Sequence, residues 1–309
     1  MHVAVAIVGF NNADDIVRCL AALAASTHAD FEVVICENGG PDAYAALTAR
    51  VPAALKGGQA VRAVLAECNL GFAGGVNRGM AETPAADAWW VLNPDTEAEP
   101  PAMAAMVARL AAGDCGAVGS TLVLPSGRVQ SRGGQWRTWL ARAVSIGHGA
   151  AKDEAADAAA VEARQNYLNG ASMMIGRRFL EAAGPMREDY FLYCEEVEWC
   201  LRAGRRGQRL GYASDAVVLH HQGTTTGNLP DMKSRGRTSV YLDARNAMLL
   251  TRDLFPLRLP VAAVCAAVIL SLRFSRRGAW RQLGYCLQGL AAGLANRRGP
   301  PAWVKVRPR

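Results

Sequence analysis

"VAVAIVGFNNADDIVRCLAALAAS", residues 3–26, is the part of this 309-residue sequence that most clearly predicts a fold class. The run over 3–10 consists of β-branched and small apolar residues, which is typical of a short buried strand. After a polar turn, Ile16, Leu20 and Leu23 recur at the three- and four-residue spacing of one helix face. The stretch therefore predicts a strand followed directly by a helix, the repeating unit of α/β proteins.

The same alternation continues along the chain. Further predicted strands share a run of buried, often β-branched residues, and they cover 31–39, 60–68, 88–95, the start of 167–184, and 208–221. A helix over 100–113 begins with two prolines, which the first helical turn tolerates. The alanine-rich stretch 139–165 has few large apolar side chains, so we expect an exposed helix or a mobile excursion there. Strands alternating with helices at this pace predict a mostly parallel sheet with helices on both faces.

The composition is that of an ordinary folded protein, with 51% hydrophobic and 20% charged residues. The length suits one large domain with an appendage, or two domains. The first residues lack the basic, apolar and small-residue regions of a signal peptide, so we expect none. The eight cysteines form no C-x-x-C pair, which favours reduced, mostly buried thiols in a cytoplasmic protein over disulfides or a zinc site.

The charge is unevenly distributed along the chain. Residues 1–227 carry 19 Lys and Arg against 24 Asp and Glu, whereas 228–309 carry 15 against 3. No acidic residue follows Asp253. We therefore divide the chain into a mildly acidic body, 1–227, and a basic C-terminal region, 228–309, whose charge predicts an anionic surface as partner.

The C-terminal region is predicted to be helical and amphipathic. The run 259–272 is uncharged and bracketed by Arg258 and Arg273, but its 14 residues are fewer than the roughly 20 that a membrane-spanning helix needs. A second helix is predicted from an apolar stripe at steps of three and four, formed by Trp280, Leu283, Leu287, Leu290 and Leu294. Both helices could pack on the body. The positive charge and the apolar stripe together favour the other interpretation. In it, both helices lie in a membrane interface, and the arginines contact anionic lipid headgroups.

Polar residues follow several of the predicted strands. The residues concerned lie at or just beyond a predicted strand end, and they are Gly9 and Asn11, Glu37 and Asn38, and Asn93 and Asp95. Each alone is compatible with a turn or a helix cap. Because ligands of open α/β sheets bind beyond the carboxyl ends of the strands, the set together predicts the polar rim of a ligand cleft.

A glycine-rich stretch, "GFAGGVNRG", covers residues 71–79. It lacks the G-x-G-x-x-G spacing of a dinucleotide-binding loop, and the chain contains no P-loop motif. Its glycines allow the backbone to approach a ligand closely. Asn77 and Arg78 stand near the start of the predicted helix, a position that favours a phosphate.

The order of the motifs resembles a known family. The succession is "VAIVGFNN", "ENGGPD", "NLGFAGGVNRGM", "WWVLNPDTE", "NGASMMIGRR", "FLYCEEVEWCLR", "AVVLHHQGTT" and "YLDARN", over roughly residues 3–253. It looks like the family 2 glycosyltransferases, and within them like the bacterial rhamnosyltransferases that use dTDP-rhamnose. The resemblance implies a GT-A fold, which is a Rossmann-like, mostly parallel sheet, here followed by a C-terminal helical appendage.

The resemblance also implies a metal site and a nucleotide-sugar site. The family's Asp-x-Asp corresponds to Asn93-Pro94-Asp95, so Asp95 would be the main anionic ligand of Mg²⁺ or Mn²⁺. His220 would complete the metal site, with His221 as the alternate. The residues expected to contact the nucleotide-sugar are Gly9, Asn11, Glu37, Asn38, Asn69, Gly71, Phe72, Gly74, Asn77, Arg78, Asn93 and Arg245.

Three glutamates stand together in "FLYCEEVEWCLRAG", residues 191–204. By resemblance, Glu195 and Glu196 are the family's acidic pair, and Glu196 is the catalytic base where relatives commonly have aspartate. An aromatic pocket and neighbouring like charges would raise the pKa of such a base and match it to a sugar hydroxyl. The alternative is a solvated helix start, where glutamates favour the helix dipole, and it can fully account for Glu198.

The function implied is that of a metal-dependent, inverting glycosyltransferase. The donor would be dTDP-L-rhamnose, and the acceptor a saccharide or lipid-linked saccharide of bacterial surface polysaccharide synthesis. The expected location is cytoplasmic, with the C-terminal region peripheral on the inner membrane face, and no nucleic acid is expected as a partner. Alternatives are transfer of galactofuranose or a hexose from a UDP-sugar, a nucleotidyltransferase, and a non-catalytic saccharide-binding relative.

Overall fold

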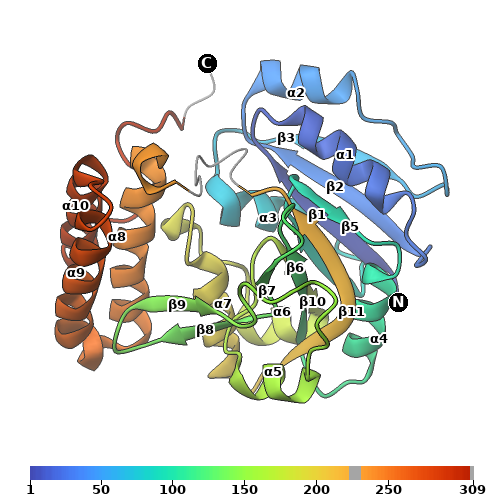
Figure 1. Ribbon diagram of the computed structural model, residues 1–309. Coiled ribbons are helices and arrows are strands. Elements are labelled where there is room, and N and C mark those ends of the chain that lie inside the picture. Colours follow the sequence, from blue (N-terminus) through green and yellow to red (C-terminus); the bar gives the residue numbers. More distant parts are fainter. Residues whose placement is uncertain (223–230, 307–309) are drawn as a thin grey trace.

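The computed structural model describes residues 1–222 and 231–306, and within them one large twisted sheet forms the centre of the protein (Figure 1). Nine strands of the described chain form this sheet: β1 (Val3–Gly9), β2 (Phe31–Glu37), β3 (Val61–Leu65), β4 (Ala88–Leu92), β5 (Thr96–Ala98), β6 (Ala117–Val123), β7 (Val129–Ser131), β10 (Ser172–Gly176) and β11 (Leu210–His220). A separate hairpin pairs β8 (Gly134–Arg137) with β9 (Arg142–Ser145).

Helices cover both faces of the sheet, as predicted. One face packs against α1 (Ala13–Leu23), α2 (Pro41–Thr48) and α4 (Ala102–Ala111). The other face packs against α3 (Gly71–Ala81), α6 (Arg177–Ala183) and α7 (Glu195–Gly204). The remaining helices are α5 (Ala158–Arg164), α8 (Arg237–Leu254), α9 (Leu259–Ser275), α10 (Trp280–Leu294) and the short η1 (Glu188–Tyr190), η2 (Met232–Ser234) and η3 (Pro256–Arg258).

The first strand and helix form as the sequence predicts. Val3, Val5 and Ile7 of β1 point to the face that α1 covers, whereas Ala4 points to the opposite face with α3. This alternation is the two-residue period of a strand whose two faces are both buried. The predicted apolar stripe of α1 is buried against the same side of the sheet.

The sheet is mostly parallel, in the order β3-β2-β1-β4-β10-β6-β11-β5. β3, β2, β1 and β4 run parallel to one another, and β6 runs parallel to β11. β10 lies antiparallel between β4 and β6, so its first residues meet the edge where the parallel strands end. β6, a central strand, was not predicted from the sequence.

The alanine-rich stretch 139–165 is attached to the body at several points. It contributes β9 and then α5, whose start is capped by Asp157, since that carboxylate accepts the Ala160 N–H at 3.0 Å. Glu162 of α5 pairs with Arg109 of α4 at 2.8 Å. The exposed helix that we expected is therefore present, but it is short and fixed to its neighbours.

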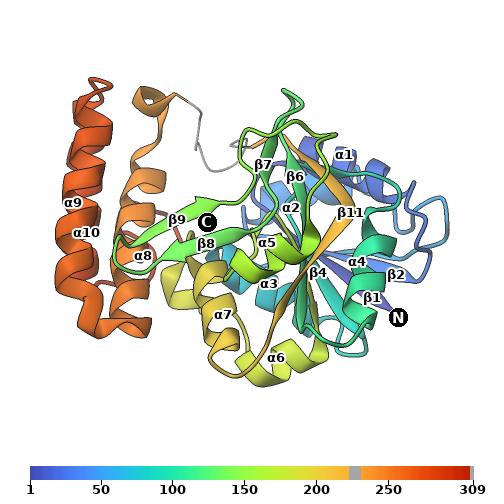
Figure 2. The same ribbon diagram turned by 60° about the horizontal axis from the view of Figure 1, so that its bottom comes forward.

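The C-terminal helices form a layer beside the sheet. In Figures 1 and 2, α8 lies between the body and the pair α9 and α10. One continuous hydrophobic cluster includes side chains of α7, α8 and α10, so this region and the body share a core. The boundary that we predicted at 227/228 falls outside the described residues.

The length that we assigned to the first C-terminal apolar helix was wrong. η3 and α9 together form a stretch of 20 residues, Pro256–Ser275, that is long and apolar enough to cross a membrane by length and composition alone. Only 17% of its most apolar 18-residue segment is buried in the protein. The uncharged run of 14 residues is shorter than the helical stretch, because helical structure includes Arg258 and Arg273 and continues beyond them.

Close contact between α8 and α10 gives a prediction about stability. A methyl group on Gly293 would stand 2.4 Å from the Arg245 carbonyl oxygen, whereas one on Gly284 of the same helix would meet open space. We expect Gly293→Ala to lower the free energy of unfolding by about 1–3 kcal/mol through overpacking. Gly284→Ala should raise it by up to about 1 kcal/mol through helix propensity. Urea denaturation of both variants measures the difference, and equal effects would contradict this packing.

Candidate active site

A cleft of about 610 Å³ opens at the edge of the sheet where β1 and β4 end, a volume that suits a small-molecule ligand. It is bounded by the starts of α3, α7 and α8 and by the end of β11. Of the residues predicted for the site, those that line it are Asn38, Asn69, Gly71, Phe72, Asn93, Asp95, Glu195, Glu196 and His220. The structure thus brings remote segments of the sequence together in one cleft.

Asp95 and His220 meet on one wall of the cleft. β5 pairs with the end of β11 so that Thr96 stands opposite His220, which brings the preceding Asp95 beside the imidazole. Nε2 of His220 lies 3.3 Å from Oδ1 of Asp95, and both side chains are buried. Nδ1 of His220 lies 2.8 Å from Oε1 of Gln130, an amide oxygen that can only accept a hydrogen bond.

This arrangement fits a divalent cation. With Nδ1–H donating to Gln130, a neutral His220 presents the lone pair of Nε2 toward the Asp95 carboxylate. Carboxylate oxygen and imidazole nitrogen are both ligands for Mn²⁺, and carboxylate oxygen suits Mg²⁺. In the described parts of the chain no group of three or more His, Cys, Asp or Glu side chains is arranged to hold a metal. A cation held by Asp95 and His220 could take further ligands from a bound substrate or from water.

His221 lies differently from His220. Its Nε2 is 2.7 Å from Oε1 of Glu97, and it is not among the residues that line the cleft in the described chain. Of the two neighbouring histidines, His220 is thus the one beside Asp95.

The loop before α7 has an unusual backbone. Phe191, Tyr193 and Cys194 have φ angles of 70°, 74° and 67°, in the left-handed region that residues other than glycine rarely adopt. Each such residue costs roughly 1–2 kcal/mol relative to a right-handed conformation. The loop must therefore be held by contacts from outside it.

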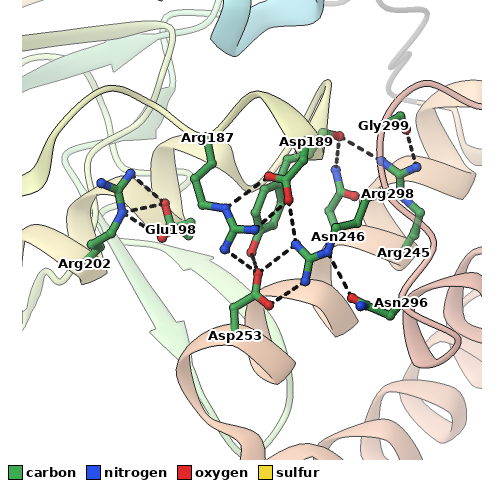
Figure 3. Close-up of polar contacts among 11 residues, drawn as sticks. Arg187, Asp189, Glu198, Arg202, Arg245, Asn246, Asp253, Asn296, Arg298 and Gly299 are labelled. Carbon is green, nitrogen blue, oxygen red and sulfur yellow. Dashed lines mark hydrogen bonds and ion pairs between the residues drawn. The ribbon is translucent and has the colours of Figure 1, made fainter.

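Asn246 of α8 supplies much of that support (Figure 3). Its Nδ2 donates to the carbonyl oxygens of Tyr190 at 3.0 Å, Leu192 at 2.8 Å and Tyr193 at 2.8 Å. The side chain is completely buried, so these carbonyls have no access to water at that point. The two N–H groups of one amide are therefore shared among three carbonyls of the strained loop.

Arg245 holds the same loop from the next position. Its Nη2 donates to the Tyr190 carbonyl at 2.8 Å, and its Nη1 donates to the Gly299 carbonyl at 2.5 Å. Arg245 is buried and is not among the residues that line the cleft in the described chain; Figure 3 shows its bond to Gly299. The residue that we expected to contact the nucleotide-sugar thus joins the loop to the C-terminal segment in this structure.

An ion-pair network extends this support. Asp253 of α8 binds Arg187 at 2.8 Å and Arg298 at 2.6 Å, and it accepts the Tyr190 hydroxyl at 2.8 Å (Figure 3). Arg187 and Arg298 also both bind Asp189. The C-terminal segment therefore takes part in fixing the loop that precedes α7.

The loop delivers two glutamates to the first turn of α7. Glu195 is buried, and its Oε2 has no hydrogen-bond partner among the described residues. Glu196 is partly exposed and lines the cleft beside Gly170. Burial raises the pKa of both carboxyl groups; the charge of Glu196 adds to the effect on Glu195, and that of Asp243 to the effect on Glu196. A raised pKa is what we expect of a carboxylate that acts as a general base.

Glu198 has a different role from its two neighbours. It is buried on another side of α7 and binds Nε of Arg202 at 2.8 Å, as Figure 3 shows. Arg202 in turn donates to the carbonyls of Ala183 and Pro185. This ion pair accounts for Glu198 as a structural residue, which was the alternative left open for it.

Gly71 connects α3 to the strained loop. Its φ is +72°, and a methyl group there would stand 2.2 Å from the Phe191 carbonyl oxygen. That oxygen accepts the Phe72 N–H at 2.8 Å. Only glycine fits this position without displacing the loop.

Several predicted residues do not line the cleft as residues 1–222 and 231–306 define it; they are Gly9, Asn11, Glu37, Gly74, Asn77, Arg78 and Arg245. Glu37 accepts the N–H groups of Asn11 at 3.1 Å and Gly39 at 2.8 Å, which shapes the turns after β1 and β2. Asn77 donates to the Met186 carbonyl at 2.8 Å. Arg78 pairs with Glu82 at 2.8 Å. Their side chains are thus engaged in contacts within the protein.

Other residues of the site were not predicted from the sequence. Gln130, Asn169 and Phe191 line the cleft, and so do residues 236–239 at the start of α8. Asn169 and Gly170 could have been found, because an Asn-Gly pair before a strand marks a sheet edge and β10 begins where its neighbours end. For Gln130 the sequence offers no signal, since it acts through a contact over a long sequence separation. Asn246 ends the motif "YLDARN", but nothing in that motif predicts its contacts with the loop before α7.

Comparisons with known proteins agree with the fold. A family model described as "Glycosyltransferase like family 2" matches residues 2–239. An N-acetylglucosaminyl-diphospho-decaprenol L-rhamnosyltransferase of Mycobacterium tuberculosis is 26% identical over 234 residues, which cover 69% of this chain and 74% of that protein. A low-salt glycan biosynthesis hexosyltransferase of Haloferax volcanii is 33% identical over 92 residues, which span only 28% of its length and 29% of this chain.

Solved structures share the fold at low sequence identity. A mannosyltransferase from Pyrobaculum calidifontis, in complex with GDP-Man and Mn²⁺, superposes with a TM-score of 0.58 at 15% identity, covering 96% of this chain and 88% of that one. S. aureus TarS 1–349 in complex with UDP-GlcNAc gives a TM-score of 0.55 at 14% identity, covering 89% of this chain and 73% of that one. These similarities establish the α/β architecture.

The support of the loop by Asn246 can be tested directly. Asn246→Ala removes the donor of the Leu192 and Tyr193 carbonyls and one of the donors of the Tyr190 carbonyl, so we expect the free energy of unfolding to fall by about 2–4 kcal/mol. Asn246→Asp keeps the shape but replaces the donor with an acceptor, and should be at least as damaging. Gln288→Ala, at an exposed position of α10, is the control and should stay within about 0.5 kcal/mol of the unmodified protein. Urea denaturation that finds Asn246→Ala equal to the control would refute this role.

Proposed function

The chain belongs to glycosyltransferase like family 2, and from that premise we propose that it is an inverting enzyme that transfers L-rhamnose from dTDP-L-rhamnose to a lipid-linked saccharide. The observation that supports a transfer reaction is that two kinds of acidic site line one cleft. Asp95 beside His220 is suited to a metal-bound diphosphate, and Glu196 is suited to an acceptor hydroxyl.

Glu196 is the base in the proposed reaction. Its carboxylate takes the proton from the acceptor hydroxyl while that oxygen forms a bond to the anomeric carbon of the donor sugar. The bond from the anomeric carbon to the diphosphate oxygen breaks on the opposite face, and its electron pair leaves with the nucleoside diphosphate. A single displacement of this kind inverts the anomeric centre, so a β-linked donor gives an α-linked product.

Asp95 and His220 would hold a divalent cation, Mg²⁺ or Mn²⁺. Such an ion, when bound, offsets the negative charge that develops on the leaving diphosphate. The nucleoside and sugar would lie against the other cleft residues, with Asn38 on the nucleobase side and Asn93 close to the diphosphate. The mannosyltransferase and TarS structures, which contain nucleotide-sugars, are consistent with this use of the fold.

Two considerations support the choice of donor and acceptor. The motifs resemble those of dTDP-rhamnose-using enzymes, and the mycobacterial relative is named for L-rhamnosyl transfer to a diphospho-decaprenol acceptor. We propose the cytoplasmic face of the membrane as the place of reaction, because a lipid-linked acceptor lies there together with soluble donor. Transfer of galactofuranose or another hexose from a UDP-sugar is the second candidate, and the UDP-GlcNAc complex of TarS is the observation in its favour.

A donor screen tests the assignment. The purified protein is incubated with Mn²⁺, a lipid-linked N-acetylglucosamine acceptor and each of dTDP-rhamnose, UDP-galactofuranose, UDP-glucose and GDP-mannose, and products are identified by mass. We expect a rhamnosyl product to dominate. Turnover of a UDP-sugar without turnover of dTDP-rhamnose would replace the donor, and no turnover with any donor would favour a non-catalytic relative.

A matched pair of variants separates catalysis from stability. Glu196→Gln removes the proton acceptor, so we expect kcat to fall by about 10²- to 10⁴-fold with little loss of donor binding. Glu198→Gln weakens the buried pair with Arg202, so it should lower the free energy of unfolding by roughly 1–3 kcal/mol and leave kcat near that of the unmodified enzyme. If Glu196→Gln kept full activity, the base would have to be another residue.

The pH dependence of the rate gives a further check. Glu196 accepts a proton only when ionised, so kcat should rise with pH through its pKa, which burial holds above the usual value of about 4.3. Asp243→Asn removes a negative charge that contributes to this shift, so the midpoint of the pH–rate profile should move to lower pH. A midpoint at the ordinary glutamate value, or one unmoved in Asp243→Asn, would contradict this account of Glu196.

A further inference from the structure

α9 carries a row of exposed apolar side chains. Val261, Val264, Val268 and Leu272 are 49%, 64%, 53% and 49% exposed, and they recur at steps of three and four, which places them on one side of the helix. Leu257, just before α9, continues the row and is 94% exposed. The opposite side of α9 packs inward through Ala262, Ala266 and Phe274.

This row faces away from the rest of the protein. α9 and α10 are the outermost helices in both views, with α8 between them and the sheet (Figures 1 and 2). Exposed apolar side chains that are scattered singly are common, but a contiguous row along a whole helix marks an interaction site. We call the side of α9 formed by Leu257, Val261, Val264, Val268 and Leu272 the apolar face.

Arginines bracket the apolar face, and acidic residues are absent from this part of the sequence. Arg258 stands at one end of α9, and Arg273, Arg276, Arg277 and Arg281 gather around the turn that leads into α10. No Asp or Glu occurs after Asp253. An apolar row with an arginine at one end and a cluster of arginines at the other is complementary to a surface with an apolar interior and anionic headgroups.

Aromatic residues accompany the arginines at both ends. Trp139 is 53% exposed, and the Arg258 guanidinium lies 4.9 Å from its ring. Trp280, the first residue of α10, is 65% exposed. Tryptophan is favoured at the level of lipid headgroups, where its ring is partly in an apolar and partly in a polar environment.

We propose that the apolar face of α9 docks in the plane of an anionic lipid bilayer, with the arginines at both ends binding phosphate groups of the lipids. In this arrangement α9 lies on the membrane and does not cross it. The valine and leucine side chains enter the boundary between headgroups and acyl chains, and α8 and the sheet remain in water.

The docked orientation would bring the candidate active site close to the lipid surface. The first turn of α10 packs against η2, where Gln282 of α10 donates to the Lys233 carbonyl. η2 leads into the start of α8, and Gly236, Thr238 and Ser239 there line the cleft. This consequence rests on the proposed function, because it places a lipid-linked acceptor within reach of Glu196. The docking itself does not depend on any enzymatic activity.

Vesicle flotation tests the docking. The full-length protein is mixed with vesicles of phosphatidylcholine alone, or of equal parts phosphatidylcholine and phosphatidylglycerol, and the floated fraction is measured. We expect strong flotation with the anionic vesicles, weak flotation with the neutral ones, and a decrease with the anionic vesicles alone as salt is added. Failure of the unmodified protein to float with anionic vesicles would overturn the proposal.

Paired variants locate the binding surface. Val264→Asp combined with Val268→Asp puts two charges on the apolar face and should reduce the bound fraction at least tenfold, whereas Leu65→Asp, at an exposed apolar position on β3, should not. Arg276→Glu with Arg277→Glu should remove the preference for anionic vesicles, whereas Arg164→Glu with Arg209→Glu on the body should leave it intact. Flotation unchanged by both C-terminal variants would place the contact elsewhere and refute the proposal.

Two other occupants of the apolar face are outcomes of the same experiments. If the unmodified protein is a dimer by light scattering and the two-aspartate variant is a monomer, the face is an interface between copies of this chain, and the proposal fails. If the protein stays in cell membranes after an alkaline carbonate wash, the helix spans the bilayer, and in-plane docking is wrong. Turnover of a water-soluble acceptor should be unchanged in all these variants, so loss of docking and loss of activity are distinguishable.

Discussion

The hydrogen bonds from the Asn246 side chain to the carbonyls of Tyr190, Leu192 and Tyr193 are the interaction on which the site depends. The loop that they hold has three left-handed residues and no glycine among them, so it would not adopt this shape by itself. Because α8 satisfies the carbonyls from outside, the chain can turn sharply and begin α7 at Glu195. The position of both cleft glutamates follows from that turn.

The same loop organises the neighbouring elements. The Phe191 carbonyl accepts the N–H of Phe72, and Gly71 leaves room for it, so the start of α3 is fixed against the loop. The network of Asp253, Arg187 and Arg298 attaches the loop to the C-terminal segment. The helices after residue 230 therefore contribute to the geometry of the cleft as well as to the core. In the proposed docking they also carry the contact with the lipid bilayer, so one helical layer would serve both chemistry and location.

Local patterns predicted much of this fold and the part of the site that lies at strand ends. Apolar periodicity predicted β1, α1, β2 and the parallel strands beside them. Asp95 follows β4 and His220 is the last residue of β11, and both line the cleft. The resemblance to a known family distinguished Glu196 from Glu195 and Glu198. No spacing rule could make that distinction. Patterns did not reveal β6 or the pairing of β5 with β11, because these depend on contacts between distant segments. Arg245 illustrates the same limit, since only the structure reveals that its charge is directed at carbonyls of the loop.

The central claim is that the loop held by Asn246 sets Glu196 in the same cleft as the pair of Asp95 and His220, around a nucleotide diphosphate. A crystal structure of the protein with dTDP and Mn²⁺ tests it most directly, because anomalous scattering locates the ion independently of the protein atoms. The account predicts Mn²⁺ bound to Asp95 and His220, with the diphosphate extending toward the side of the cleft where Glu196 lies. An ion bound at other residues, or a nucleotide that leaves Glu196 facing only solvent, would contradict it.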